Sequence, residues 1–257
     1  RPELGTVTFR RGDFSFDPRT LDFRIESGGA QHGMDFDAAG RKFVCSNSHH
    51  IQQVMYERRY AGANPNFSPP SPLVDIPVDG ASATVFRLSP DEAWRVIRTR
   101  WRVAKQVSGP VEGGGRASGY FTAATGMTIY DGHAWPSRFS GDAFIADCGS
   151  NLVHRKKLRG GRIQFEAERP GDESDREFLA STDNWFRPVQ MEVGPDGALY
   201  IADMYREVIE HPWSLPRGIK QHIDLDSGND RGRIYRVVPE KFAQPRSPRL
   251  GQATVGE

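Results

Sequence analysis

DNWFRPVQMEVGPDGALYIADMYRE, residues 183 to 207, is the stretch that decides the fold prediction. Apolar and polar residues alternate over 189–193, a GPDG turn follows, and 198–202 is again apolar and rich in β-forming residues. Period-two alternation around a glycine-containing turn predicts a β-hairpin. Because its strands are antiparallel, Arg187 at the start of the first strand and Asp203 at the end of the second should be neighbours on one rim.

The same hairpin pattern recurs twice upstream. Residues 31–46 align with it, and a looser copy joins 126–130 to 141–147. The copies are preceded or followed by further strand-like stretches at 5–10, 13–17, 21–26, 51–56, 152–158, 162–167 and 233–238. Repeated four-stranded antiparallel units are typical of the blades of a β-propeller. We therefore predict an all-β fold, a partial β-propeller of about three to four blades that forms an open arc with exposed edges.

The predicted propeller domain spans residues 1–240, and the polar, proline-containing segment 241–257 is interpreted as a C-terminal linker. Residues 61–116 interrupt the repeat as a long loop insertion, with a strand candidate at 84–88 and a mixed segment at 91–106. Such an insertion is expected to lie over one face of a propeller and shape a pocket there. A second interruption, 204–230, contains a short helix candidate at 216–222.

Composition excludes several classes of protein. The 257 residues carry 34 basic and 33 acidic side chains, so no overall charge favours binding to nucleic acid or anionic lipid. No apolar run reaches the ~20 residues of a membrane-spanning helix. Cys45 and Cys148 match neither a disulfide framework nor a haem or zinc motif, and we expect two unpaired thiols.

Polar side chains should gather at one rim of the propeller, because hairpin geometry brings strand starts and strand ends together. This is where propellers usually bind ligands. An alternative interpretation is that these groups cap strand ends and satisfy one another. The starts supply Gln31, His32 and Arg187, and the ends supply Ser46, Asn47, Asp147, Asn151, Asp203 and Arg206.

Three roles follow from these residue types. His32 can act as a general base near neutral pH, and the Arg187 guanidinium can hold an anionic or carbonyl oxygen. Asp147 and Asp203 can position a ligand or a calcium ion. The alternatives are that His32 is only hydrogen-bonded and that Arg187 joins two blades by ion pairs. His154 alternates within a strand and either lies near the rim or faces the next blade.

Eight motifs spread over the chain up to Pro239 also resemble one family. They are SGGAQHG (27–33), FVCSNSHHIQ (43–52), GPVEGGG (109–115), GYFTAATG (119–126), NLVHR (151–155), TDNWFRPVQ (182–190), DMYREVIEHP (203–212) and SGNDRGRIYR (227–236). As a set they resemble the PVC-type haem-binding family of membrane-bound dehydrogenases. The propeller of that family is in turn similar to the soluble quinoprotein glucose/sorbosone dehydrogenases.

The resemblance implies a cofactor and a partner. An arginine at the position of Arg187 helps to hold pyrroloquinoline quinone in the related enzymes, although this chain reads Arg-Pro where they usually read Arg-Asn-Pro. Gln31, Gln190 and Arg206 lie in the matching motifs and are assigned to the same cofactor site. Relatives carry a c-type haem segment after the propeller. The resemblance therefore also implies a bacterial, extracytoplasmic location and electron transfer to a haem domain outside this chain.

Two functional hypotheses result. The first is a quinoprotein-like dehydrogenase that oxidises a sugar or an alcohol, with His32 and Asp203 as catalytic residues. The second is a non-catalytic propeller that binds carbohydrate or a protein partner through the same rim. Fold and family resemblance do not by themselves establish chemistry.

Overall fold

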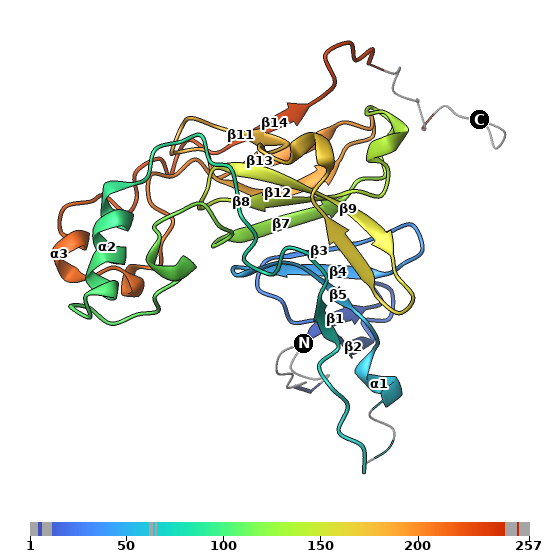
Figure 1. The fold of residues 1–257 in the computed structure, drawn as a ribbon. Helices are drawn as coiled ribbons and strands as arrows, with labels where there is room; N and C mark the ends of the chain where they lie inside the picture. Colours follow the sequence, from blue (N-terminus) through green and yellow to red (C-terminus); the bar gives the residue numbers. More distant parts are fainter. Residues whose placement is uncertain (1–4, 7–11, 62–63, 65, 245–250, 252–257) are drawn as a thin grey trace.

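The computed structural model describes residues 5–6, 12–61, 64, 66–244 and 251, and over them the chain is mostly β (Figure 1). It forms four small antiparallel sheets. The strands are β1 (Asp13–Phe16) and β2 (Phe23–Glu26) in the first sheet; β3 (Gly33–Phe36), β4 (Lys42–Ser46), β5 (His49–Val54) and β6 (Leu73–Asp75) in the second; β7 (Ala124–Ile129), β8 (Ala143–Asp147), β9 (Leu152–Gly160), β10 (Phe165–Glu168) and β11 (Leu179–Ala180) in the third; and β12 (Pro188–Val193), β13 (Leu199–Asp203) and β14 (Arg233–Val237) in the fourth.

The helical segments of the described chain are short apart from one. They are α1 (Arg58–Ala61), α2 (Ala93–Val103), α3 (Arg217–Lys220) and the 3₁₀ turns at Gly113–Gly115, Ser137–Phe139, Gly171–Glu173 and Pro212–Ser214. None of the helices in the described ranges is long and apolar enough to cross a membrane.

All three predicted hairpins are confirmed. β12 and β13 place Pro188 opposite Asp203, β3 and β4 place Gly33 opposite Cys45, and β7 pairs with β8. The sheets nevertheless hold two, four, five and three strands, so the regular four-stranded repeat is not found, and a propeller arrangement is not confirmed. The predicted strand at 5–10 and the linker at 241–257 lie mostly outside the described residues.

Among the first strands of the three larger sheets, β7 lies against both β3 and β12. The Thr125 hydroxyl in β7 donates to the Pro188 carbonyl at 2.9 Å, and the Cys45 thiol donates to the Thr125 carbonyl at 2.7 Å. Cys45 and Cys148 are both buried, and neither forms a disulfide, as expected. A methyl group on Gly33 would stand only 2.7 Å from the Thr125 carbonyl oxygen. Close packing of these strands therefore requires glycine at this position.

Two apolar clusters fill the spaces between neighbouring sheets. The first joins the second and third sheets and includes Phe43, Ile51, Phe121, Met127 and Ile145. The second joins the third and fourth sheets and includes Tyr130, Phe144, Val153, Met191 and Ile201. Both sheet faces of the β7–β11 sheet are thus covered, which explains the continuous burial of β8 and of the first half of β9.

The 61–116 insertion differs from its prediction in three ways. Its residues 73–75 form β6, the fourth strand of the second sheet. The strand candidate at 84–88 forms only an isolated bridge between Thr84 and Tyr120, because the Phe86 N–H donates to the Glu177 carboxylate instead of to a neighbouring strand. The mixed segment at 91–106 contains α2, the longest helix of the described chain.

The two interruptions of the repeat pack against each other. Helices α2 and α3 lie side by side at one end of the molecule (Figure 1). Trp94 of α2 shares a small apolar cluster with Val208, Leu215 and Ile219 of the second interruption. The helix candidate at 216–222 is confirmed as α3. We call residues 87–123 and 204–230 together the α-lobe.

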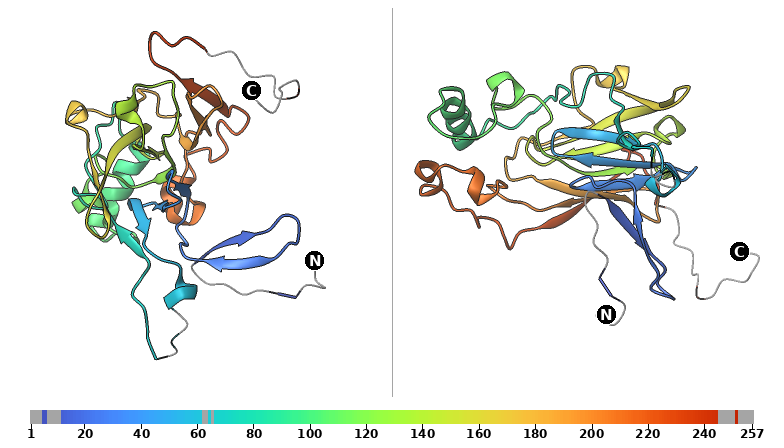
Figure 2. Two further views of the ribbon diagram at one scale, coloured as in Figure 1. Left: turned by 90° about the vertical axis from the view of Figure 1, so that its right-hand side faces the viewer. Right: turned by 90° about the horizontal axis from the view of Figure 1, so that it is seen from below.

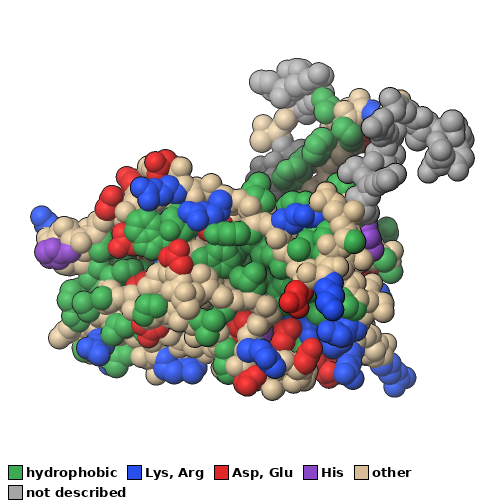
Figure 3. Space-filling model, turned by 90° about the horizontal axis from the view of Figure 1, so that it is seen from above, with side chains coloured by type: hydrophobic (Ala, Val, Ile, Leu, Met, Phe, Trp, Pro, Cys, Tyr) green, Lys and Arg blue, Asp and Glu red, His purple; other side chains and the backbone are tan. Residues whose placement is uncertain are grey.

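Two edges of the β structure are exposed. The β1–β2 hairpin projects from the rest of the protein (Figure 2), with Phe16 and Ile25 about half exposed. Strand β14 pairs only with β13 among the described strands, and Ile234 and Tyr235 on it are exposed. Figure 3 shows the face above β11 and β14, where apolar side chains lie between charged ones. The exposed edges agree with the prediction.

The close approach of β3 and β7 can be tested with Gly33→Ala. The added methyl group would meet backbone and sulfur atoms that have little room to move, so we expect the free energy of unfolding to fall by roughly 1–3 kcal/mol. The control is Gly171→Ala, where nothing lies within 4 Å of the added carbon. Equal stability of both variants in denaturant unfolding would contradict the packing described.

Candidate functional site

The strand starts and ends of the three larger sheets do meet at one end of the structure. The Asn47 carbonyl after β4 accepts from the Ala124 N–H at 3.2 Å. The Cys148 N–H after β8 donates to the Ala123 carbonyl at 3.2 Å, and the Cys148 carbonyl accepts from Arg187 at 2.9 Å. These contacts link the three hairpins across one rim. The α-lobe lies against this rim and divides it into an exposed and a buried part.

The exposed part of the rim consists of uncharged side chains. His32 Nε2 lies 2.9 Å from Asn47 Oδ1, and Gln31 Oε1 accepts from the Asn47 N–H at 3.2 Å. The Gln31 N–H in turn donates to the Ser46 hydroxyl at 3.2 Å. Gln31, His32 and Asn47 are exposed. Three predicted site residues thus form one hydrogen-bonded group that a ligand in solution can reach.

The buried part of the rim is centred on Arg187, which has no exposed surface. Its guanidinium donates to the carbonyls of Cys148, Arg206 and Glu207 at 2.9, 2.9 and 2.6 Å. It also donates to the Glu92 carboxylate at 3.0 Å. All three guanidinium nitrogens are therefore occupied by the protein itself, as in the interpretation of Arg187 as a strap between blades.

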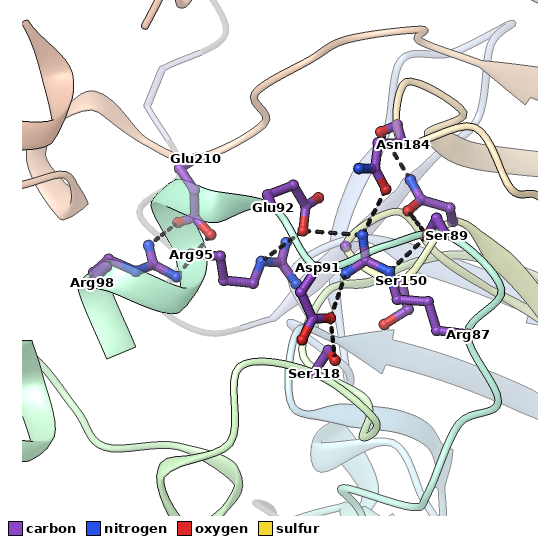
Figure 4. A network of polar contacts seen from close by, with 12 residues as sticks. Arg87, Ser89, Asp91, Glu92, Arg95, Arg98, Ser118, Ser150, Asn184 and Glu210 are labelled. Carbon is purple, nitrogen blue, oxygen red and sulfur yellow. Dashed lines mark hydrogen bonds and ion pairs between the residues drawn. The ribbon is translucent and has the colours of Figure 1, made fainter. Parts of the chain in front are cut away.

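Glu92 is the residue that sequence reasoning missed. It precedes α2, is 7% exposed, and lies between three arginines, as Figure 4 shows for two of them. Arg87 and Arg187 each approach its carboxylate at 3.0 Å, and Arg95 approaches it at 3.5 Å. Burial acts to raise the pKa of Glu92, but the three positive charges hold that pKa below its usual value. Glu92 is therefore a buried anion.

Asp203 and Arg206 lie beside Arg187, as the hairpin predicted for Asp203. Asp203 Oδ1 accepts from the N–H groups of Arg187 and Tyr205, each at 2.8 Å. Its Oδ2 is buried and has no hydrogen-bond partner among the described residues, although Arg233 lies 3.9 Å away. Arg206 is half-buried and donates to the Asp226 carbonyl at 3.0 Å. Asp203 thus shapes the end of the hairpin.

Asp147 and Asn151 are fully buried and satisfied within the protein. Asp147 Oδ1 accepts from the N–H groups of Gly149 and Ser150 at 2.9 and 3.0 Å, and burial raises the pKa of this carboxyl. Asn151 donates to the Phe186 carbonyl at 2.6 Å and accepts from the Ser89 hydroxyl at 2.6 Å. Asp147 therefore stabilises the turn between β8 and β9, and Asn151 links that turn to Phe186 and Ser89.

Calcium ligands were predicted near Asp147. Within the described part of the chain, no three His, Cys, Asp or Glu side chains cluster closely enough to hold a metal ion. The 224–230 segment forms turns, in which the Asp226 N–H donates to the Asp224 side chain at 2.9 Å. The described residues thus provide no preformed metal centre.

His154 and Gln190 lie away from the exposed group. His154 is opposite Ile145 in the middle of the β8–β9 pair rather than at the rim, and its Nδ1 lies 2.6 Å from Glu177 Oε2 in the core. Burial lowers the pKa of His154 well below its ordinary value, so the ring is neutral. Gln190 is exposed and lies directly against Gly126 of β7. The core position of His154 agrees with the alternative that it faces the neighbouring sheet.

A sequence signal for the α-lobe contacts did exist. Arg95, Arg98 and Arg102 recur at spacings of three and four, which places them on one face of a helix. The sequence prediction for 91–106 contains no helix, so it does not identify this positively charged face. The Glu92–Arg187 pair has no such signal, because its members are 95 residues apart.

Comparisons with known proteins identify a family but not a function. The sequence model of a family described as "Domain of unknown function (DUF7133)" matches residues 2–241, and the chain belongs to this family. No curated protein matches the chain. Among solved structures, two glucose dehydrogenases are similar to this chain, each with a TM-score of 0.30. Each match covers 73% of this chain and 68% of the glucose dehydrogenase chain, and the sequence identities are 13% and 14%. A likeness this distant carries no argument about activity.

The role of Arg187 as a strap can be tested with Arg187→Ala. The change leaves Glu92 buried with fewer positive charges and three carbonyls without a donor, so we expect the free energy of unfolding to fall by about 3–5 kcal/mol. Arg19→Ala is the control, because the Arg19 side chain is 86% exposed and its ion pair should contribute almost nothing. An unchanged melting temperature of Arg187→Ala would contradict the structural role and would favour a role of Arg187 in ligand binding.

The neutral His154 ring predicts a dependence of stability on pH. Its pKa is lowered in the folded state, so unfolding takes up a proton, and the stability from this group is lost as pH falls below about 6.5. Between pH 6.5 and 5, we expect the free energy of unfolding to fall less steeply in His154→Gln than in the wild type, by up to about 1.4 kcal/mol per pH unit. Parallel curves for both proteins in denaturant unfolding would show that His154 does not titrate on unfolding.

Proposed function

We propose that this member of the DUF7133 family binds a sugar or an alcohol at the exposed part of the rim, through Gln31, His32 and Asn47. The observation that carries the proposal is the division of the rim by charge. The charged residues Asp147, Arg187 and Asp203 are buried and Arg206 is half-buried, whereas the exposed groups Gln31, His32 and Asn47 are two uncharged amides and an imidazole. Such groups suit a neutral ligand with hydroxyl groups, because each can donate or accept a hydrogen bond without giving up the hydration of a charge.

His32 is the side chain in this part of the rim that could take part in acid–base chemistry. A carboxamide oxygen only accepts hydrogen bonds, so the contact with Asn47 Oδ1 places the ring proton on Nε2. A neutral His32 then presents the lone pair of Nδ1 as an acceptor. An imidazole held in this tautomer can accept the hydrogen of a ligand hydroxyl and so act as a general base.

This tautomer is the observation that favours a second candidate function, oxidation of the bound hydroxyl compound by a quinoprotein-like dehydrogenase. Pyrroloquinoline quinone would supply the two-electron acceptor, and a c-type haem domain outside this chain the next carrier. Arg187, the main residue assigned to the quinone, does not fit that role in this arrangement, because it is buried and its nitrogens already donate to the protein. We therefore derive no step through a quinone and place binding ahead of oxidation. An extracytoplasmic location belongs to the same proposal and rests on the sequence resemblance.

Calorimetric titration with glucose, other monosaccharides and small alcohols tests the binding function. We expect saturable binding by the wild type and binding roughly tenfold weaker in His32→Ala, which loses one ligand hydrogen bond and releases Asn47. His222→Ala is the control, since this exposed histidine lies in the α-lobe next to α3.

The same proteins separate the two candidates. Reduction of a dye in the presence of sugar, pyrroloquinoline quinone and calcium, lost in His32→Ala, would favour the dehydrogenase. Saturable binding without dye reduction would favour the binding module. Absence of binding to every sugar and alcohol, or equal binding by wild type and His32→Ala, would contradict the proposed site.

A further inference from the structure

An arginine-lined cavity lies in the α-lobe, apart from the rim. It lies between α2 and the segment 110–123, and Glu210 borders it from the other interruption. Its volume is about 30 Å³ for the centre of a water-sized sphere, two to three times the minimum of ~10–15 Å³ for one water. The cationic and polar side chains that line it are Arg95, Arg98, Arg102, Arg116, Tyr120 and Thr122.

Three of these arginines are placed by helix geometry. Arg95, Arg98 and Arg102 lie on one face of α2 (Ala93–Val103), and the apolar cluster around Trp94 fixes that face toward the second interruption. Arg116 follows the 3₁₀ turn at Gly113–Gly115, and its Nε donates to the Gly113 carbonyl at 2.9 Å. The four cations therefore come from two segments that close the same space.

Several donors of these arginines are buried without an acceptor. The Arg95 and Arg98 side chains are 4% and 8% exposed. Within the described ranges, Arg95 Nη1, Arg98 Nε and Arg102 Nε have no hydrogen-bond partner. Buried donors are nearly always paired, because an unpaired one loses the hydrogen bond it makes to water. Unpaired guanidinium donors beside a cavity indicate that an acceptor belongs in it.

The charges of the lining favour an anion as that acceptor. Four arginines face Glu112 and Glu210, and Arg98 already engages Glu210 at 2.8 and 3.1 Å. Burial, followed by the nearby charge of Arg98, lowers the pKa of Arg102. An anion between Arg98 and Arg102 would relieve this repulsion. The lining as a whole carries two more positive than negative charges, counting four arginines against two glutamates.

We propose that the cavity binds a phosphate-sized oxyanion, either free or as the phosphate group of a small organic monoester. A dianion matches the charge excess of the lining, and tetrahedral oxygens can accept from guanidinium groups that approach from two segments. A cavity this small would hold the anionic group alone, so any organic part would lie outside it. The proposal does not rest on sugar or alcohol binding at the rim.

The site is coupled to the rim through Arg95. This side chain lines the cavity and also forms the 3.5 Å ion pair with Glu92 (Figure 4). Glu92 in turn binds Arg187. Arg95 is therefore unsuited to a clean test, because its loss also weakens the buried network. Arg102 and Arg116 take no part in that network and are the residues to change.

The test is a calorimetric titration of the folded chain with inorganic phosphate, with sulfate as a second probe, at constant ionic strength adjusted with chloride. We expect saturable binding of phosphate and a loss of roughly tenfold or more in affinity in Arg102→Gln and in Arg116→Gln. Arg100→Gln is the matched control, because Arg100 lies on α2 and carries the same charge but is exposed and does not line the cavity. It should bind phosphate as the wild type does.

Glucose 6-phosphate distinguishes the two sources of the anion. Tighter binding of this monoester than of phosphate assigns the cavity to an organic phosphate, and tighter binding of phosphate assigns it to the free ion. Thermal melting of each variant establishes that it is folded. If Arg102→Gln does not fold, the phosphate affinity of Arg116→Gln tests the proposal. No saturable binding by the wild type, or equal losses in Arg100→Gln and Arg102→Gln, would overturn the proposal.

Discussion

The structure around the rim depends on one buried cation, the guanidinium of Arg187. It joins the carbonyl after β8, the carbonyls after β13 and the carboxylate before α2, so it connects the third sheet, the fourth sheet and the α-lobe. Charge-assisted hydrogen bonds of this kind are strong where water is excluded, and an unpaired charge there is correspondingly costly. The rim can therefore be closed by the α-lobe only while Arg187 and Glu92 remain paired.

The same pairing sets the electrostatics of the neighbouring lobe. Glu92 forms ion pairs with three arginines but has a single negative charge, so these four side chains together have a net positive charge. Arg95 belongs to this network and also lines the cavity, so its positive charge contributes to both. The exposed part of the rim has no charged member, and its hydrogen bonds run among Gln31, His32 and Asn47. Two chemically different surfaces thus lie on either side of one buried ion pair.

Sequence reasoning recovered what is encoded locally. Alternation and turn glycines located all three hairpins, and hairpin geometry placed Asp203 beside Arg187. Burial of the rim was not foreseen, because it depends on Glu92 packing against a residue 95 positions away. The strand candidate at 84–88 failed for a similar reason, since Glu177 takes the backbone donor of Phe86. Local patterns do not report contacts of this range.

The shared apolar cluster of the α-lobe makes the two interruptions of the β repeat a single packing unit. Trp94 on one segment and Val208, Leu215 and Ile219 on the other form one buried cluster, against which Trp101, Ile223 and Leu225 also pack. A lineage that deleted only residues around α2 would expose the apolar side of α3 to water. Homologues should therefore gain or lose the two segments together, so that length variation at one site is correlated with length variation about 110 positions further along the chain.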